Sequence, residues 1–197
     1  MKYDLVSFDM DGTLITEDFS NTVWGDGLPS MYAEEYEMNI EDARRETIDE
    51  IRALGNRDMR CYDLPYWISK FSLSYEDDAW ATATKMVHKY RSRVTPIEKT
   101  VLMLEEALRS GCRVIVISNA WPMFLEVGLG KYAWRFEKIF STTFDYGFHE
   151  VKSPRLFQAI CCAMGVDPEK ALHIGNDKYF DGVCPIVAGM DAKLVEG

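Results

Sequence analysis

The sequence predicts an α/β protein with a doubly wound, parallel, Rossmann-like sheet into which an α-helical subdomain is inserted. Two observations predict this fold. Short apolar runs typical of buried strands alternate with segments of helical periodicity near both ends of the chain. Between them, apolar residues recur only at helical spacing. We therefore expect a core formed by residues 1–15 and 95–197, and a helical insertion formed by residues 16–94.

The elements of the core follow from apolar runs and from residues that start or stop helices. Residues 3–8 predict the first strand. The segment Thr95-Pro96-Ile97-Glu98 resembles a capping box with proline at the first helical position, and it predicts a helix that Gly111 ends. The other expected core elements are strands at 113–117, 138–142, 171–174 and 192–195, a helix from Ser153-Pro154 to Gly165, a turn at Asp167-Pro168 and a helix near 178–187.

The insertion is expected to be helical throughout. Asn39 can cap a helix that Gly55 ends, and Ser74 can start another helix. Shorter helices are expected near residues 30–38 and 65–71. Most of the aromatic rings in this block are expected to pack in its core, as large rings at helical spacing usually do. Trp24 is the exception, because it lies in a stretch that resembles a glycine-rich loop, and we expect its ring to face a substrate.

Two aspartates follow the first predicted strand directly. Asp9 and Asp11 stand two residues apart in the segment Asp9-Met10-Asp11-Gly12-Thr13. Two carboxylates this close repel each other unless a cation or a shared proton neutralises them. Gly12 allows a sharp backbone turn, and Thr13 can hold the loop through its hydroxyl. An isolated acidic turn fits a structural role equally well, so a catalytic interpretation depends on the rest of the chain.

Three later segments supply further reactive groups where a parallel sheet would end in loops. They are, in chain order, Ser118 and Asn119 after the strand 113–117, Lys152 just before the helix at Ser153-Pro154, and Asn176, Asp177 and Asp181 after the strand 171–174. Ligands of open α/β sheets bind beyond the carboxyl ends of the strands. We therefore expect these groups to converge with the first acidic loop.

With these four segments, the chain resembles the haloacid dehalogenase-like hydrolase superfamily. The four motifs of that family are DxDGT, an apolar run ending in Ser or Thr, a lysine, and an acidic GD…D segment. They correspond here to Asp9–Thr13, Ser118, Lys152 and Gly175–Asp181. The insertion follows the first motif, where this family carries a helical cap of the C1 type, and that position favours a gating role. A lid-like subdomain without any part in selectivity is the alternative.

The charges of the site and the resemblance imply the same chemistry. A phosphate ester would be repelled by the acidic groups unless a cation compensates them, and Mg²⁺ suits an oxygen-rich site. Asp9 would attack phosphorus to form an aspartyl-phosphate, with Asp11 as acid and base and Lys152 offsetting charge in the transition state. The phosphate-binding residues would be Ser118, Asn119 and Lys152, the metal ligands Asp9, Asp11, Asn176 and Asp177, and the supporting residues Thr13 and Asp181.

Two departures from the family pattern concern the last two motifs. Asn176 stands where the family has its metal-binding aspartate, so Asp177 is expected to assist or to replace it. Ser153 stands where proline commonly follows the lysine. The presence of Asp11 favours phosphoryl transfer over dehalogenation. A phosphomutase or phosphotransferase, and a non-catalytic module that binds a phosphorylated ligand or a protein, remain the alternatives to a phosphatase of a small phosphorylated metabolite.

Composition and charge exclude several other classes. The formal net charge of −10 disfavours nucleic acid and anionic membranes as partners. No apolar run is long enough to span a bilayer, and the N-terminus lacks the features of a signal peptide, so we expect a cytoplasmic protein. The five cysteines contain no CxxC pair and are expected to be thiols. His173 is expected to be a packed residue rather than a catalyst.

Overall fold

The computed structural model describes residues 2–73, 78–145 and 149–196. The chain divides into two compact units. The first unit consists of Met1–Glu17 and Thr95–Gly197, and the second of Asp18–Val94. The second unit is therefore an insertion that interrupts the first unit shortly after its opening strand.

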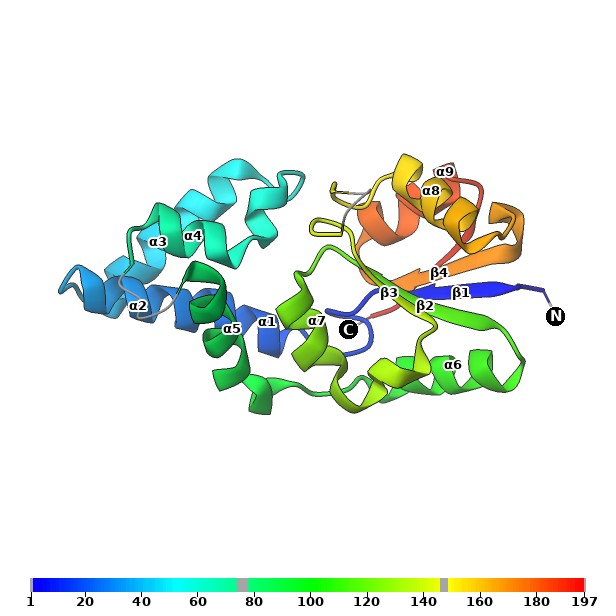
Figure 1. Cartoon of the computed structure of the whole chain (residues 1–197), viewed down its shortest axis with the longest axis horizontal. Helices are drawn as coiled ribbons and strands as arrows, with labels where there is room; N and C mark the ends of the chain where they lie inside the picture. Colours follow the sequence, from blue (N-terminus) through cyan, green and yellow to red (C-terminus); the bar gives the residue numbers. More distant parts are fainter. Residues whose placement is uncertain (1, 74–77, 146–148, 197) are drawn as a thin grey trace. The chain divides into compact units, whose positions relative to one another are not determined.

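The first unit is built on a parallel five-stranded sheet, which confirms the predicted fold class. Its strands are β1 (Leu5–Phe8), β2 (Arg113–Ser118), β3 (Lys138–Ser141), β4 (Ala171–Gly175) and β5 (Asp191–Leu194). Figure 1 shows β1 in the middle of the sheet, and the strand order is β3-β2-β1-β4-β5. The chain therefore reverses its direction of winding between β1 and β4, which is where open α/β sheets bind their ligands.

Helices cover both faces of this sheet. α8 (Pro154–Met164) and α9 (Cys184–Val187) lie on one face, and α6 (Glu98–Arg109) and α7 (Pro122–Leu129) lie on the other (Figure 1). Strands that are covered on both faces are apolar almost throughout, which explains the run Val114–Ile117 in β2. Leu5, Ile117 and Phe157 belong to the cluster that packs between the sheet and the first pair of helices.

The start of α6 differs from the expectation. The helix begins at Glu98, and its N-cap residue Ile97 provides no side-chain cap, so the predicted capping box is wrong. The residues before it are held extended instead, because Pro96 pairs with Ile15 and the Ile97 N–H donates to the Leu14 carbonyl at 3.0 Å. Tertiary pairing with the first loop therefore overrides a local helix-start pattern. The start of α8 follows the expectation, since the Ser153 hydroxyl caps it.

Several short helices complete the first unit. They are η4 (Gly130–Arg135), η5 (Pro168–Lys170) and η6 (Lys178–Val183). Neither α7 nor η4 was expected from the sequence. The expected helix near residues 178–187 is present, but it divides into the π-helical η6 and the α-helical α9. All five cysteines are free thiols.

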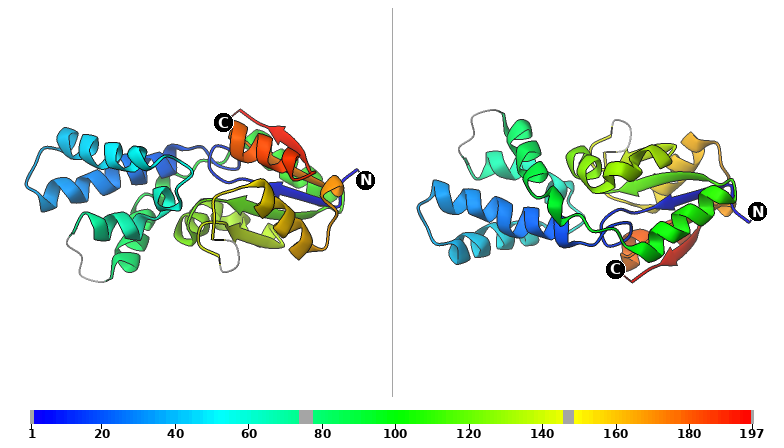
Figure 2. Two further views of the ribbon diagram at one scale, coloured as in Figure 1. Left: turned by 90° about the horizontal axis from the view of Figure 1, so that it is seen from above. Right: turned by 90° about the horizontal axis from the view of Figure 1, so that it is seen from below.

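The second unit contains helices and no strand among its described residues. Its elements are α1 (Asp18–Thr22), η1 (Val23–Gly27), α2 (Leu28–Glu35), α3 (Ile40–Leu54), η2 (Met59–Tyr62), α4 (Leu64–Lys70), α5 (Ala79–Lys89) and η3 (Arg91–Arg93). Figure 2 shows α2 beside α3 and α4 beside α5. Asn39 caps α3 as expected, with its side-chain oxygen accepting from the Asp42 N–H. Within the described ranges, no helix of the protein is both long and apolar enough to cross a membrane.

One detail of the second unit corrects the sequence interpretation. Trp24 does not lie in a loop, because α1, η1 and α2 follow one another without a break and Trp24 is part of the π-helical turn η1. The cap residue of α5 is Asp78, whose carboxylate accepts from the Ala81 N–H at 2.7 Å. The start expected at Ser74 lies outside the described residues.

Candidate active site

The loop after β1 is a tight turn built around one carbonyl. The backbone N–H of Asp9 donates to the Ile174 carbonyl at 2.9 Å, which extends the pairing of β1 with β4. The Met10 carbonyl then accepts from the N–H groups of Thr13, Leu14 and Ile15 at 2.8–3.2 Å. A carbonyl with three such donors fixes the course of the chain, so the side chain of Asp9 has a rigid backbone behind it.

Gly12 is required in this turn for two reasons. Its φ angle is +69°, a conformation that side chains other than glycine rarely adopt. A Cβ atom at this position would also lie 2.1 Å from Nδ2 of Asn176. The glycine of the first motif therefore allows the loop after β1 to touch the loop after β4. Thr13 adds to this contact, because its hydroxyl lies 3.4 Å from Oδ1 of Asn176.

Lys152 connects the loops through its buried ammonium group. Its Nζ lies 2.7 Å from Oδ1 of Asp9 and 2.6 Å from Oδ1 of Asp181. The side chain is 3% exposed, and its backbone N–H donates to Oδ1 of Asn119 at 2.9 Å. The same Asn119 oxygen accepts from the Thr142 hydroxyl at 2.8 Å. Asn119 therefore positions the lysine, a role that sequence reasoning missed.

Asp181 is the most completely buried acid of the site. Its Oδ1 lies 2.6 Å from the Lys152 ammonium and 3.0 Å from Nε2 of His173. Its Oδ2 accepts from the backbone N–H groups of Asn176 and Asp177 at 3.1 and 3.0 Å. With no exposed surface and four donors around it, this carboxylate joins β4, the loop after β4 and the start of α8.

The buried groups of this cluster alter one another's pKa values. Burial raises the pKa of the Asp9 carboxyl, Lys152 acts in the opposite direction, and the charge of Asp181 raises it further. Burial would also raise the pKa of Asp181, but Lys152 and His173 hold it well below its usual range. Burial would lower the pKa of Lys152, but its two carboxylate partners raise it. Lys152 is therefore a permanent cation beside Asp9.

The other expected site residues lie around this cluster. Ser118 ends β2, is almost fully buried, and its Oγ accepts from the Ala120 N–H at 3.3 Å. Asp11 is half-buried in the first loop, where its backbone bridges to that of Ile15. Asp177 caps η6, because its Oδ1 accepts from the N–H groups of Tyr179 and Phe180, both at 2.7 Å. The side chain expected to bind metal therefore also has a structural task.

Asn176 contacts a residue that sequence reasoning missed. Its Nδ2 donates to Oε1 of Glu17 at 3.1 Å, so an exposed carboxylate stands beside the amide that replaces the usual aspartate. Nothing in the sequence pattern places Glu17 there, because it lies five residues beyond Gly12 and 159 residues from Asn176. The contact arises only when the loops after β1 and β4 meet.

The donor chemistry of these residues fits Mg²⁺. Asp9, Asp11, Asn176 and Asp177 present oxygen atoms as their candidate ligands, which a hard cation prefers. Among the described residues, no group of three or more His, Cys, Asp or Glu side chains is arranged to hold a metal ion. Mg²⁺ commonly binds through one or two carboxylates and completes its shell with substrate phosphate and water, so an incomplete protein shell suits this ion.

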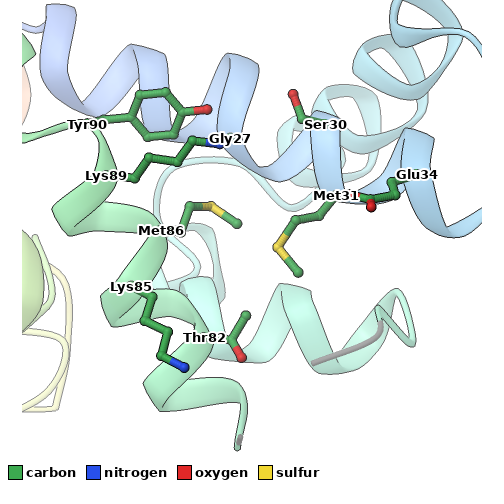
Figure 3. Close-up of a pocket in the computed structure, with 9 residues that line it drawn as sticks. All are labelled: Gly27, Ser30, Met31, Glu34, Thr82, Lys85, Met86, Lys89 and Tyr90. Atoms are coloured by element: carbon green, nitrogen blue, oxygen red, sulfur yellow. The ribbon is translucent and has the colours of Figure 1, made fainter. Parts of the chain in front are cut away.

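Two hollows lie within the second unit. The first has a volume of about 460 Å³, and Asn21, Trp24, Arg52 and Tyr62 are among the residues that line it. The second has a volume of about 270 Å³ between α2 and α5 (Figure 3). Figure 3 shows Met31 and Met86 facing each other across it, with the lysines of α5 alongside. The first hollow falls within the 300–1,000 Å³ typical of small-molecule sites.

The family model of the haloacid dehalogenase-like hydrolases matches residues 3–181, a range that includes all four motifs. The chain belongs to this family. The resemblance found in the sequence and the predicted enzyme class, a hydrolase, are thereby confirmed.

Relatives with more specific names agree with the predicted phosphatase activity. The GMP/IMP nucleotidase YrfG of Escherichia coli (strain K12) is 26% identical over 180 residues, covering 89% of this chain and 75% of that protein. The structure of a HAD phosphatase from Thermococcus onnurineus has a TM-score of 0.78 at 19% identity and covers all of this chain and 86% of the other. CbbY from Rhodobacter sphaeroides, in complex with phosphate, has a TM-score of 0.67 at 16% identity, with 99% and 87% covered. The two structures show a shared fold.

Proposed function

We propose that this protein is a Mg²⁺-dependent cytoplasmic phosphatase that hydrolyses a small phosphorylated metabolite through an aspartyl-phosphate. The observation that carries this proposal is the buried chain of contacts from Asp9 through Lys152 to Asp181 at the carboxyl ends of β1 and β4. A carboxylate fixed beside a permanent cation is suited to attack an anionic phosphate, because the cation offsets the charge that the substrate brings.

The reaction follows from the positions of the two aspartates in the first loop. An oxygen of Asp9 forms a bond to phosphorus while the ester oxygen leaves and takes a proton from Asp11. Asp11 then removes a proton from water, which attacks the aspartyl-phosphate and releases inorganic phosphate. Lys152 and the donors at the end of β2 hold the phosphoryl oxygens. When bound, Mg²⁺ would be held by the oxygen ligands already named and would neutralise phosphoryl charge.

Asp9→Asn tests the nucleophile. The amide has nearly the same shape but cannot attack phosphorus, so turnover of p-nitrophenyl phosphate with Mg²⁺ should fall by several orders of magnitude while the fold persists. The matched control is Asp4→Asn, which changes the same group before β1 and should leave turnover near the wild-type rate. Residual activity of Asp9→Asn above about one per cent of the wild-type rate would exclude Asp9 as the nucleophile.

We further propose 6-oxopurine nucleoside monophosphates as the first substrate class to test. YrfG is named for GMP and IMP, which both carry such a base. Within the second unit, the hollow around Trp24 offers groups suited to a purine, because its indole and phenol can stack on a base and Arg52 supplies a guanidinium. Arginine pairs with O6 and N7 of guanine, whereas adenine presents an amino donor at the first of these positions.

Arg52→Ala tests this substrate class. The ratio of kcat/KM for IMP over AMP should fall by about five- to tenfold, the lower part of the range for a bidentate arginine–base contact. Arg45→Ala is the control on the same helix, because Arg45 pairs with Asp42 and does not line the hollow. A ratio that Arg52→Ala leaves unchanged would remove this hollow from base recognition.

A further inference from the structure

Two polar side chains lie where the neighbouring strands are otherwise apolar. Ser7 of β1 and His173 of β4 are direct partners in the parallel register, and neither has any exposed surface. Burying an imidazole and a hydroxyl is costly unless both form hydrogen bonds. Oγ of Ser7 lies 2.7 Å from Nδ1 of His173, and Nε2 of His173 lies 3.0 Å from Oδ1 of Asp181.

The directions of the two hydrogen bonds follow from Asp181, which is the last group in this series of contacts. That carboxylate is ionised and can only accept, so Nε2 of His173 must carry a proton. Burial lowers the pKa of His173, so the ring is neutral and its Nδ1 is an acceptor. The Ser7 hydroxyl therefore donates to Nδ1 at 2.7 Å rather than to the Leu172 carbonyl, which lies 3.3 Å away.

We propose that Ser7 and His173 are positioning residues for Lys152. Asp181 fixes the tautomer of His173, and Ser7 holds the ring by donating to its Nδ1, so that the Nε2–H of His173 holds Oδ1 of Asp181, the oxygen that also binds the Lys152 ammonium. The contacts therefore run from Ser7 through His173, Asp181 and Lys152 to Asp9. The importance of this device for turnover rests on the proposed function, in which Lys152 binds phosphoryl oxygens.

The physical effect is a restriction of carboxylate rotation. Two backbone N–H groups hold Oδ2 of Asp181, and the imidazole adds a rigid donor to Oδ1. Without that donor, Lys152 alone would hold Oδ1, and the position of this oxygen would be less restricted. A purely structural alternative exists, because the His173 ring also packs edge-on against Phe157 with ring centroids 4.8 Å apart.

Nitrogen NMR of the histidine rings tests the tautomer without any need for activity. The chain has three histidines, and the resonances lost in His173→Gln identify those of His173. In the wild type at pH 7.5, we expect a neutral ring protonated at Nε2. In Ser7→Ala, we expect the ring to stay protonated at Nε2, while the Nδ1 resonance shifts because that nitrogen loses its hydrogen bond. A wild-type ring protonated at Nδ1, or a Ser7→Ala spectrum identical to the wild type, would overturn the proposal.

Two substitutions of His173 separate positioning from packing. Glutamine places an amide N–H near the position of Nε2, whereas asparagine places one near Nδ1, so only glutamine can still donate to Asp181. Both lose the contact with Phe157. With p-nitrophenyl phosphate, we expect His173→Gln to retain kcat within about threefold and His173→Asn to lose about ten- to a hundredfold, with KM less affected.

The outcomes remain separable from those of the proposed function. Equal losses of kcat in the two variants, accompanied by equal decreases in melting temperature, would show that His173 only fills the core. If the wild type itself fails to turn over phosphate esters, the proposed function fails. The NMR experiment would then still decide whether Ser7 donates to Nδ1 of His173.

Discussion

Replacing Asp181 with asparagine removes one charge from the centre of the site and almost no volume. The wild-type carboxylate accepts from the Lys152 ammonium, the His173 ring and two backbone N–H groups. An amide has one oxygen and one NH₂ group, so whichever way it is turned, its NH₂ faces a pair of donors. The substitution therefore leaves two buried donors without an acceptor and Lys152 with Asp9 as its remaining acidic neighbour in the cluster.

The expected loss of stability can be bounded from these contacts. Breaking a buried ion pair costs about 3–5 kcal/mol, and the lower end applies because Lys152 keeps Asp9 at 2.7 Å. For a chain of this size, about 3 kcal/mol lowers Tm by roughly 6–12 °C. Turnover should also fall, because the ammonium is no longer held between two carboxylates.

Thermal unfolding followed by circular dichroism at pH 7.5 measures this loss. Asp191→Asn is the matched control, because Asp191 also accepts from a lysine and a hydroxyl, those of Lys2 and Tyr3, but at the surface. Water screens such a pair, so this control should melt within about 2 °C of the wild type. If the Tm of Asp181→Asn differed from that of the wild type by no more than the Tm of the control does, Asp181 would not be the residue that holds the site together.

Two further predictions concern β4 and the loop after it. Asp177→Asn keeps an oxygen for the cap of η6, and it should raise the Mg²⁺ concentration needed for half-maximal rate more than Asn176→Ala does. Asp177→Ala should in addition lose about 1 kcal/mol of stability, because it also removes the cap. A lower Tm with an unchanged Mg²⁺ titration would show that Asp177 is only a helix cap. His173 has a pKa below the unfolded value of about 6.5, so its contribution to stability is present above that pH and is lost as the pH falls through it. Between pH 7.5 and 5.5, Tm should therefore fall more steeply in the wild type than in His173→Gln, and parallel slopes would show that His173 does not titrate with unfolding.

The sequence by itself determined the strands, most of the longer helices and the chemistry that the strand ends carry. Short apolar runs predicted strands that are buried on both faces. The alternation of these strands with helices predicted the parallel sheet. Start and stop residues located α3 and α8, because Asn39 and Ser153 satisfy N–H groups of their own helices. The four motifs also identified the family, since three of them place reactive side chains at strand ends and the other places Lys152 just before α8.

Only the tertiary structure decided which side chains meet. The Thr95 capping box failed because Ile15 and Leu14 hold Pro96 and Ile97 in extended pairing, a contact between residues about 80 positions apart. Glu17 beside Asn176, Asn119 beneath Lys152, and Ser7 opposite His173 depend in the same way on strand register and loop contact. Local sequence patterns carry no information on register, because a one-residue shift between two apolar strands preserves their composition while exchanging every partner.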